Sequence, residues 1–453
     1  MSPPAQRTAY RDSHGRVTLV FYNRPRHCGG TCLYCISDPG VTKSTVANED
    51  TRLARDCGWD PTCQMSKRFA RYGLRRGTGA KFGLAVKGDS FTNHDPEYLL
   101  DYFRGLYDYL NGEPSASFDE ARARQASAPD RCVAVQAETR PDLIDEEWCV
   151  RLARLGVTTV ELGVQCLDDD VLAVNRRGHG VETVARATAL LRDHGFEVGY
   201  HMMVGLPSSS FELDLEVLTE RLWRREFSPD CIKIYPCILM RNRRLQPQLA
   251  RYAARTTWES LTDERYRELL RTAYPHIPSA VHVNRIQRLM PPEDIELGPR
   301  ASIDRATFDD VSRCLWQRSL AQTDHPRDGD FSHVRIRSTP HGTGDCVTAT
   351  VRDGRVVIGY GRLSAVDGVG LIRDLRVLGT MTPVGAAPTG PQHSGVGRAM
   401  LREMTARAAQ KGCRWLEVRP AVGSVKYFEK AGFVPSGAYR LRRPVPVPNI
   451  DHP

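Results

Sequence analysis

The sequence predicts two α/β domains in succession: a full or partial barrel of parallel strands, then a smaller domain built on antiparallel strands. Three observations support this. The chain has 453 residues, which is long for one hydrophobic core. Strand and helix patterns alternate from about residue 80. After about residue 335 this alternation gives way to the period-two pattern of antiparallel strands.

The first domain is expected over residues 20–295, after an N-terminal tail of residues 1–19. A strand over 16–23 opens it, and a buried strand over 81–88 precedes an amphipathic helix over 96–110. Further strands are expected over 131–139, 158–165, 197–207 and 231–239, and helices over 145–156, 180–195 and 211–225. Repeated βαβ units bring the carboxyl ends of all strands to one edge, where the chemistry of such barrels gathers.

The second domain is expected over residues 331–445, after a linker over 296–330 and before a C-terminal tail of 446–453. Period-two strands occupy 347–379, followed by a helix over 394–412, a strand over 413–420 and a short helix over 424–432.

Composition and local sequence indicate the cellular compartment and the possible partners of the protein. The N-terminus has no apolar signal-peptide region, and no apolar run approaches 18 residues, so neither secretion nor a membrane span is expected. Most of the 13 cysteines stand alone in apolar segments, as do Cys132, Cys149 and Cys166, which is typical of free thiols in a reducing cytoplasm. The net charge of +9 permits a polyanionic partner such as RNA without requiring one.

The stretch "CGGTCLYC" places Cys28, Cys32 and Cys35 directly after the first strand. Three thiolates can hold a [4Fe-4S] cluster and leave one iron open. The open iron can bind S-adenosyl-L-methionine, whose reductive cleavage gives an adenosyl radical. The alternatives are a zinc site or three buried cysteines, but structural zinc usually has four ligands in paired spacing.

Polar residues follow the other predicted strands, where they would face the same edge. Gly88 and Asp89 form a turn that could cradle the methionine end of the cofactor. Glu138 could accept a hydrogen bond from its amine or ribose, and Arg140 could hold a carboxylate or phosphate. The remaining candidates at strand ends are Glu161, Gln165, His201, Lys233 and Tyr235. For each residue taken alone, a purely structural role is the alternative.

In the second domain, "QHSGVGRAM" places Gly395 and Gly397 where a loop runs into a helix. Backbone N–H groups at such a helix start form a pyrophosphate site, and Arg398 adds positive charge. The surrounding strands and helices have the layout of a GNAT-type acyl-CoA domain. The alternative is a purely structural turn.

Taken together, the two domains resemble the catalytic subunit of Elongator and its single-chain bacterial and archaeal relatives. The motifs that carry the resemblance are "CGGTCLYC", "ETRPD", "TTVELGVQ", "NRRGH", "HMMVGLP", "CIKIYP", "VNRIQR", "IRDLRVLG", "QHSGVGRAM" and "YFEKAGF". The resemblance implies modification of the tRNA wobble uridine. In that reaction the adenosyl radical takes hydrogen from the methyl group of acetyl-CoA, the acetyl radical adds to C5 of uracil, and hydrolysis leaves a carboxymethyl group.

The resemblance also assigns roles to residues. Cys28, Cys32 and Cys35 would ligate the cluster, and Lys233 and Tyr235 would line the active site. It further implies that Arg285, Gln287 and Arg288 lie near the acceptor, that Gln392, His393, Gly395 and Gly397 hold acetyl-CoA, and that Tyr427 lies close to its thioester.

Several departures from the family concern the acceptor and the acyl group. Only 27 residues precede Cys28, where the family has a longer basic segment that helps to grip tRNA. The family's paired glycine is Gly88–Asp89 here, and its double tyrosine is Tyr427–Phe428. In ordinary GNAT enzymes a tyrosine at the Phe428 position protonates the leaving thiolate, which phenylalanine cannot do.

Two alternatives therefore stay open beside tRNA carboxymethylation. The first is a biosynthetic relative that acts on a free nucleoside, nucleotide or natural-product precursor. The second is a conventional amine or lysine acetyltransferase with a structural cluster, against which Phe428 speaks. The expected partners are tRNA or a small nucleoside-type substrate, and an electron donor such as a flavodoxin or ferredoxin.

Overall fold

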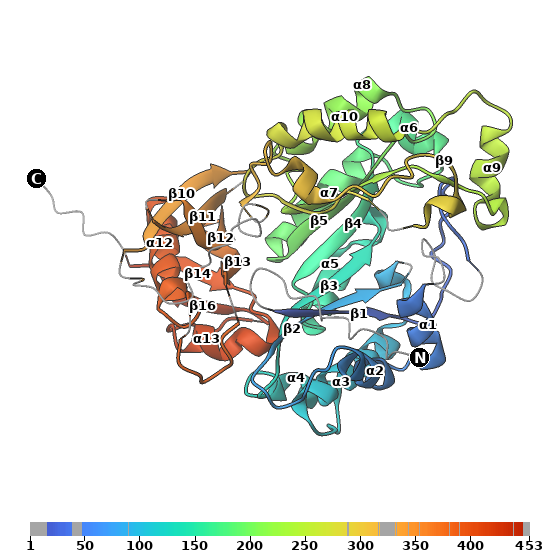
Figure 1. The fold of residues 1–453 in the computed structure, drawn as a ribbon. Helices are drawn as coiled ribbons and strands as arrows, with labels where there is room; N and C mark the ends of the chain where they lie inside the picture. The colour runs from blue at the N-terminus through green and yellow to red at the C-terminus, as the bar shows by residue number, and fades with distance from the viewer. Residues whose placement is uncertain are drawn as a thin grey trace, which may run out of the picture.

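The computed structural model describes residues 16–38, 48–88, 90–287, 290–315, 317, 331, 333–342, 344–352, 354–379, 381–388, 390–437 and 439–446. Two sheets dominate this part of the chain (Figure 1). The first is a seven-stranded sheet in the order β1-β2-β3-β4-β5-β6-β8, and the second is a seven-stranded sheet in the order β10-β11-β12-β13-β14-β16-β15. The expected fold class is confirmed, with the first sheet forming an open half-barrel.

Every strand pair of the first sheet is parallel. Its strands are β1 (Val17–Tyr22), β2 (Lys81–Lys87), β3 (Arg131–Thr139), β4 (Thr159–Gln165), β5 (Glu197–Val204), β6 (Cys231–Pro236) and β8 (His282–Arg285). The short strands β7 (Leu239–Met240) and β9 (Ile295–Leu297) pair separately. The carboxyl ends of the seven parallel strands form one rim, as the alternation of elements predicts.

Helices cover the outer face of the half-barrel (Figure 1). They are α1 (Glu49–Asp56), α2 (Pro61–Arg71), α3 (Pro96–Asn111), α4 (Phe118–Arg124), α5 (Glu146–Arg154), α6 (Asp169–Val174), α7 (Val181–Asp193), α8 (Phe211–Thr219) and α10 (Asp263–Ala273). Helix α9 (Pro247–Ala253) lies apart from them at the rim, beside the loop of Cys32 and Cys35 (Figure 1). Polar side chains cap many of them: Asp145 accepts from the N–H of Trp148 at α5, and Ser210 accepts from Leu213 at α8. No helix in the described ranges combines the length and apolar character that a membrane crossing requires.

The second sheet forms the core layer of the C-terminal domain. Its strands are β10 (Arg335–His341), β11 (Gly344–Val351), β12 (Val356–Val366), β13 (Val369–Val377), β14 (Trp415–Val418), β15 (Val434–Pro435) and β16 (Leu441–Pro444), with helices α12 (Val396–Gln410) and α13 (Val425–Glu429). Strand β13 pairs with β14 only over residues 369–372. The two strands therefore part beyond residue 372, next to the start of α12.

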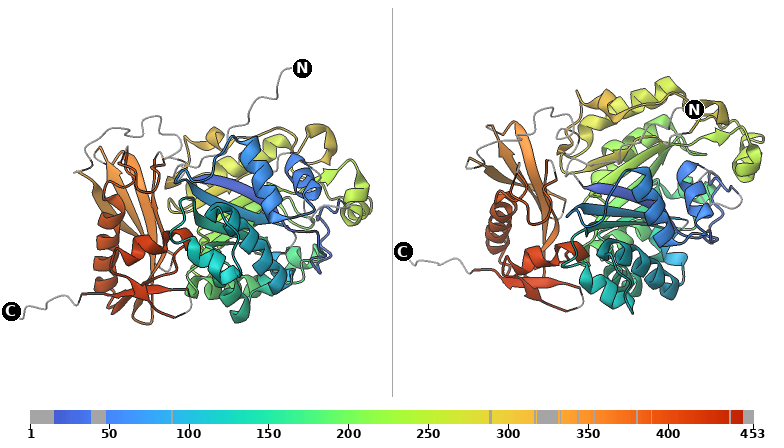
Figure 2. Two further views of the ribbon diagram at one scale, coloured as in Figure 1. Left: turned by 90° about the horizontal axis from the view of Figure 1, so that it is seen from below. Right: turned by 60° about the horizontal axis from the view of Figure 1, so that its bottom comes forward.

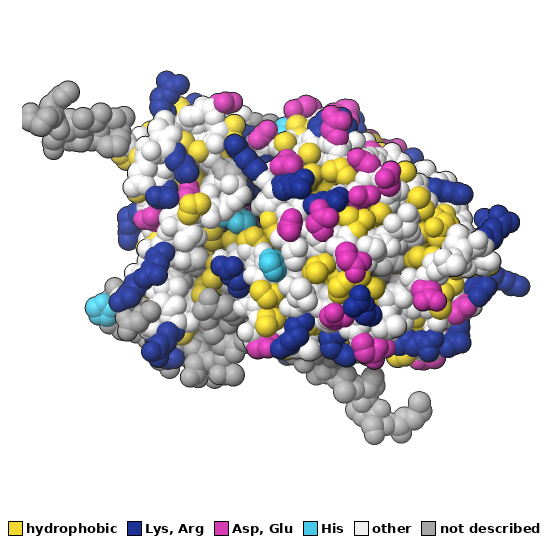
Figure 3. Space-filling model, turned by 90° about the horizontal axis from the view of Figure 1, so that it is seen from above, with side chains coloured by type: hydrophobic (Ala, Val, Ile, Leu, Met, Phe, Trp, Pro, Cys, Tyr) yellow, Lys and Arg dark blue, Asp and Glu magenta, His cyan; other side chains and the backbone are white. Residues whose placement is uncertain are grey.

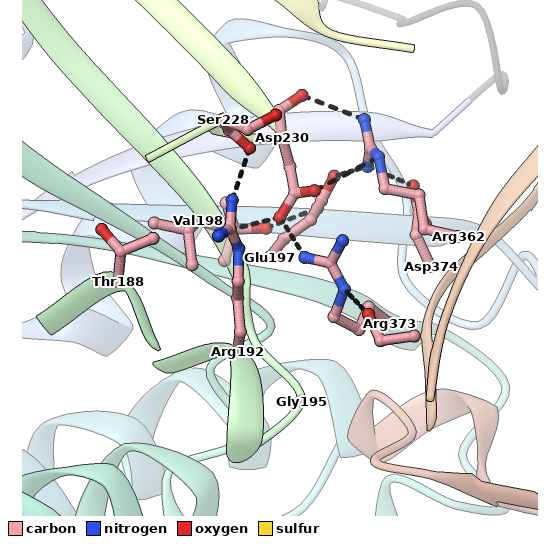
Figure 4. Close-up of polar contacts among 12 residues, drawn as sticks. Thr188, Arg192, Gly195, Glu197, Val198, Ser228, Asp230, Arg362, Arg373 and Asp374 are labelled. Atoms are coloured by element: carbon pink, nitrogen blue, oxygen red, sulfur yellow. Dashed lines mark hydrogen bonds and ion pairs between the residues drawn. The ribbon is translucent and has the colours of Figure 1, made fainter. Parts of the chain in front are cut away.

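The second domain docks against the amino ends of the parallel strands, opposite the rim (Figures 1 and 2). Arg362 of β12 is 1% exposed and reaches into the bottom of the half-barrel. Its guanidinium lies 2.8 Å from Glu197 at the start of β5 and donates to the carbonyl oxygens of Asp230 at 2.9 Å and Ala280 at 2.6 Å. Arg373 of β13 adds a contact of 2.7 Å to Asp230 (Figure 4). Buried charges of opposite sign thus join the two domains.

The cysteines follow the expectation with one addition. Most, including Cys132, Cys149 and Cys166, form no disulfide, whereas Cys57 and Cys63, for which no pairing was expected, are joined with a Cα–Cα distance of 5.6 Å. The reason is local: α1 ends at Asp56 and α2 begins at Pro61, so a tight turn brings the two residues together. None of the other eleven cysteines forms a disulfide.

Candidate active site and acyl-CoA site

The three predicted cluster cysteines lie on the loop that follows β1, at the rim of the half-barrel. None of the three forms a disulfide, and all three are partly exposed. The Gly30 N–H donates to the Cys28 Sγ at 3.4 Å, and Arg177 Nη1 donates to the Cys32 Sγ at 3.6 Å. A small hollow of about 50 Å³ borders Cys32 and Cys35. Cysteines outside any disulfide on one loop, with N–H donors directed at sulfur, are a donor set that fits an iron–sulfur cluster.

Two arginines flank this loop: Arg140, which was predicted as a site residue, and Arg177, which was not. Arg140 forms a two-point contact with Asp142 at 2.9 and 2.7 Å, and its guanidinium lies against Gly30, where any larger side chain would clash. Arg177 is only 6% exposed and donates to the Gly163 carbonyl as well as to Cys32. The motif "NRRGH" contained Arg177, but nothing in its sequence pattern distinguished this buried arginine from an exposed one.

Inside the half-barrel, on the side of the rim, four predicted residues meet in one cluster, although Glu161 and Lys233 lie mid-strand and not at the strand ends where they were expected. Lys233 Nζ lies 3.0 Å from Glu138 Oε1 and also contacts Glu161 closely. His201 Nε2 lies 3.0 Å from Glu161 Oε2. Lys87, which was not among the predicted site residues, pairs with Glu138 at 3.1 Å. These residues come from β2, β3, β4, β5 and β6, so the parallel register itself assembles the cluster.

The charges of this cluster are fixed by their neighbours. Burial would raise the pKa of Glu138, but Lys233 and Lys87 hold it well below its usual range. Burial lowers the pKa of His201, and Lys233 lowers it further, which keeps the imidazole neutral at pH 7. Glu161 is 1% exposed, and its Oε1 has no hydrogen-bond partner in the described ranges. The rim thus offers two ammonium donors beside one buried carboxylate oxygen that can still accept.

The remaining rim candidates are placed less uniformly. Gln165 ends β4 with a φ of 73°, and its amide folds back over Gly163. The Tyr235 ring meets His201 edge-on at 6.0 Å. Gln287 is tied to the backbone of Ala301 and Ile303, which indicates a structural role. Arg285 is exposed beside Lys233, Gly88 follows β2, and the predicted Asp89 and Arg288 lie outside the described residues.

The predicted acyl-CoA residues gather at the start of α12. Gly395 precedes the helix with a φ of 87°, and a Cβ at Gly397 would lie 2.6 Å from the Tyr427 hydroxyl. Gln392 is buried, while His393 and Arg398 are exposed on the loop and on the first helical turn. Glycines in place of side chains leave the N–H groups of this turn open, which fits a diphosphate.

Tyr427 and Phe428 differ in position as well as in chemistry. Tyr427 is 38% exposed and faces the loop, whereas Phe428 is 6% exposed and packs in the core of the second domain. Burial of part of its ring raises the pKa of Tyr427 to about 12, so its hydroxyl stays protonated at neutral pH. Of the two residues, only Tyr427 can donate a proton to a leaving thiolate.

The two groups of residues lie at opposite ends of the half-barrel. The loop before α12 contacts Lys81 at the amino end of β2, whereas Lys87 at the carboxyl end of the same strand belongs to the rim. Six residue steps of about 3.3 Å separate these ends by roughly 20 Å.

Comparisons with known proteins agree with this division. Residues 22–215 match the radical SAM superfamily, and residues 313–433 match the GNAT acetyltransferase family. The chain is 27% identical to the tRNA uridine(34) acetyltransferase of Methanocaldococcus jannaschii, over 96% of this chain and 86% of that protein. It is 26% identical to human Elongator complex protein 3, over 98% of this chain and 86% of that protein.

A solved structure extends the similarity to the fold. The archaeal Methanocaldococcus infernus Elp3 with an N-terminal deletion superposes with a TM-score of 0.77 at 25% identity, covering 95% of this chain and 99% of that one. Both domains and their order are therefore shared along nearly the whole chain. The chain therefore joins a radical SAM domain to a GNAT domain, and along nearly its whole length it is similar to Elongator complex protein 3 and its archaeal relatives.

Proposed function

We propose that the protein forms a carbon–carbon bond at C5 of a uracil-type base, with acetyl-CoA as second substrate. The tRNA wobble uridine is the favoured acceptor, because the relatives along the whole chain include proteins named tRNA uridine(34) acetyltransferase. The observation that carries the proposal is that one chain joins three cysteines outside any disulfide, on the loop after β1, to a docked acyl-CoA loop.

When bound, the [4Fe-4S] cluster and S-adenosyl-L-methionine supply an adenosyl radical. Cys28, Cys32 and Cys35 would hold the cluster. Arg177 and Arg140 lie beside them and can hold the carboxylate of S-adenosylmethionine through charge-assisted hydrogen bonds.

The polar cluster at the rim suits the acceptor base. A uracil edge presents an N–H donor between two carbonyl acceptors. Glu161 Oε1 can accept from that N–H, and the ammonium groups of Lys233 and Lys87 can donate to the flanking oxygens. The two ammonium groups and two carboxylates balance in charge, so a neutral base adds no unpaired charge to the buried site.

At the other end, the residues support thioester chemistry without a standard amine acetyltransferase arrangement. Tyr427 can protonate the departing thiolate, and Phe428 cannot. Because the diphosphate loop and the rim are about a strand length apart, the flexible arm of the acyl-CoA has to span much of that length.

The test uses anaerobically reconstituted protein with S-adenosylmethionine, a reductant and methyl-deuterated acetyl-CoA. Deuterium in the 5′-deoxyadenosine is expected, and the acceptor class is identified by whether bulk tRNA, uridine or uridine nucleotides give carboxymethylated product. 5′-Deoxyadenosine without deuterium would overturn the proposal. Acetyl transfer to an amine without S-adenosylmethionine would instead establish a conventional acetyltransferase. The Cys32→Ala variant is the matched control, and a flavodoxin or ferredoxin is the proposed physiological electron donor.

A further inference from the structure

Lys81 is a residue of the radical SAM domain that reaches into the acyl-CoA loop of the other domain. It begins β2, and its Nζ lies 2.8 Å from Gln392 Oε1 and 3.5 Å from His393 Nε2. Its backbone N–H points to the Met381 sulfur at 3.2 Å. An ammonium group from one domain therefore lies at the first residue of the diphosphate loop of the other.

A second buried group lies at the same place without a partner. Thr382 is 1% exposed, and its hydroxyl has no hydrogen bond within the part of the chain that the structure describes. Its backbone N–H donates to Gln392 Oε1 at 3.3 Å, so Thr382 and Lys81 converge on one amide oxygen. A buried hydroxyl that lacks a partner costs free energy unless a ligand supplies one.

The charges around this point all favour an anion. Arg131 is the register partner of Lys81 on β3 and bears on its pKa electrostatically, and the start of α12 adds the positive end of a helix dipole. His393 is the other titratable group in contact with Lys81, and burial together with Lys81 lowers its pKa. Among the described contacts of Lys81, none is an acidic side chain.

We propose that Lys81 and Thr382 complete the diphosphate site for acyl-CoA, so that the radical SAM domain itself binds this substrate. The inference rests on the proposed use of acetyl-CoA. Lys81 is then a binding residue that the first domain contributes to the GNAT loop. The affinity for acyl-CoA therefore depends on the docking of the two domains.

The experiment measures binding of desulfo-CoA, which cannot react, to the full-length protein by calorimetry. Lys81→Met keeps the length of the side chain and removes its charge, and it should weaken desulfo-CoA about 10–100-fold, the range for one charge-assisted phosphate contact. Lys81→Arg should retain most of the affinity. Lys67→Ala, an exposed lysine on α2, is the matched control and should bind like the wild type.

Two further readouts separate a binding role from a structural one. Pantetheine, which has no phosphate, should bind the wild type and Lys81→Met equally. Burial, with a contribution from Arg131, lowers the pKa of Lys81 to about 8, so wild-type affinity for desulfo-CoA should fall as pH rises through that value. The Lys81→Arg variant should not show this loss.

Equal affinity of Lys81→Met and wild type for desulfo-CoA would overturn the inference while leaving the proposed function intact. Equal weakening of desulfo-CoA and pantetheine would also overturn it, because the effect would then not involve the phosphates. If the wild type bound no desulfo-CoA at all, the proposed use of acetyl-CoA would fail first.

Discussion

The Arg362→Met substitution removes the central cation of the domain interface. Arg362 makes ion pairs of 2.8 Å with Glu197 and 3.1 Å with Asp374, besides its two hydrogen bonds to backbone carbonyls. Without Arg362, two arginines of the second domain remain in direct contact with the three carboxylates. Arg373 pairs with Asp230, and Arg376 pairs with both Glu197 and Asp374. Three buried carboxylates then share these two arginines, and two carbonyls lose a charged donor.

The expected loss of stability is about 3–5 kcal/mol at pH 7.5, the usual cost of removing one partner from a buried ion pair. Arg376 at 2.5 Å from Glu197 and Arg373 at 2.7 Å from Asp230 limit the loss, because neither carboxylate is left alone. Scanning calorimetry should then show separate transitions for the two domains where the wild type shows a coupled one. Arg402→Met, an exposed arginine on α12, serves as the control and should shift neither transition.

The loss should also depend on pH, with a sign that follows from the carboxylates. Burial raises the pKa of Asp374 to about 6, above its value in the unfolded chain, so protonation favours the folded state. Arg362 lowers the pKa of Asp374, Glu197 and Asp230, so removing it raises all three, that of Asp374 from a value already above the ordinary one and those of Glu197 and Asp230 from values below it. The stability deficit of Arg362→Met should therefore shrink between pH 7.5 and pH 5. A deficit below about 1 kcal/mol, or one that grows toward pH 5, would refute this account of the interface.

Three other predictions concern the two sites. Replacing Cys28, Cys32 or Cys35 by alanine should abolish the visible absorption of the reconstituted cluster, whereas Cys166→Ala, a buried thiol elsewhere, should preserve it. Arg177→Met should keep cluster absorption but weaken S-adenosylmethionine about 10–100-fold in equilibrium binding, with Arg176→Met as the exposed neighbouring control. Tyr427→Phe should slow acetyl-CoA thioester cleavage by about 100-fold or more without changing desulfo-CoA affinity, and an unchanged rate would exclude Tyr427 as the general acid.

Much of the half-barrel was predictable because its strands carry a strong local signal. The strand expected over 131–139 is found as Arg131–Thr139, since it is flanked by turns and is followed by a helix capped at Asp145. The helix expected over 211–225 ends earlier, at Thr219, because the chain continues as a short 3-10 turn over Arg221–Trp223. Local periodicity does not record such a break, which depends on packing.

The candidate site was predicted in its composition better than in its contacts. Glu138, Glu161, His201 and Lys233 were expected at strand ends, and parallel pairing does bring them together. Glu161 and Lys233 are, however, the third residues of β4 and β6, so the cluster lies inside the half-barrel and not at its edge. Lys87 was not predicted as a site residue because nothing in the local sequence distinguishes it from other lysines. Its contact with Glu138 is formed only in the folded chain. The role of Lys81 could not be predicted because its partner Gln392 is 311 residues away in the sequence. No local pattern encodes how the domain of Gln392 docks.

The position of the second domain bears on how the two halves of the reaction are coupled. On the first sheet, the GNAT domain contacts the amino ends of strands, while radical chemistry is expected at the carboxyl ends. The interior of the half-barrel is closed at its lower end by Arg362 and Glu197, so the acyl arm cannot pass along that line without displacing a buried ion pair. Strand β2 instead connects the sites along its length, with Lys81 at the diphosphate loop and Lys87 at the rim. Residues 83 and 85 of β2 are Gly and Ala, on the same face as these lysines, and the side chains of Arg16 and Thr18 lie against Gly83, so an acyl arm on this line has to displace them.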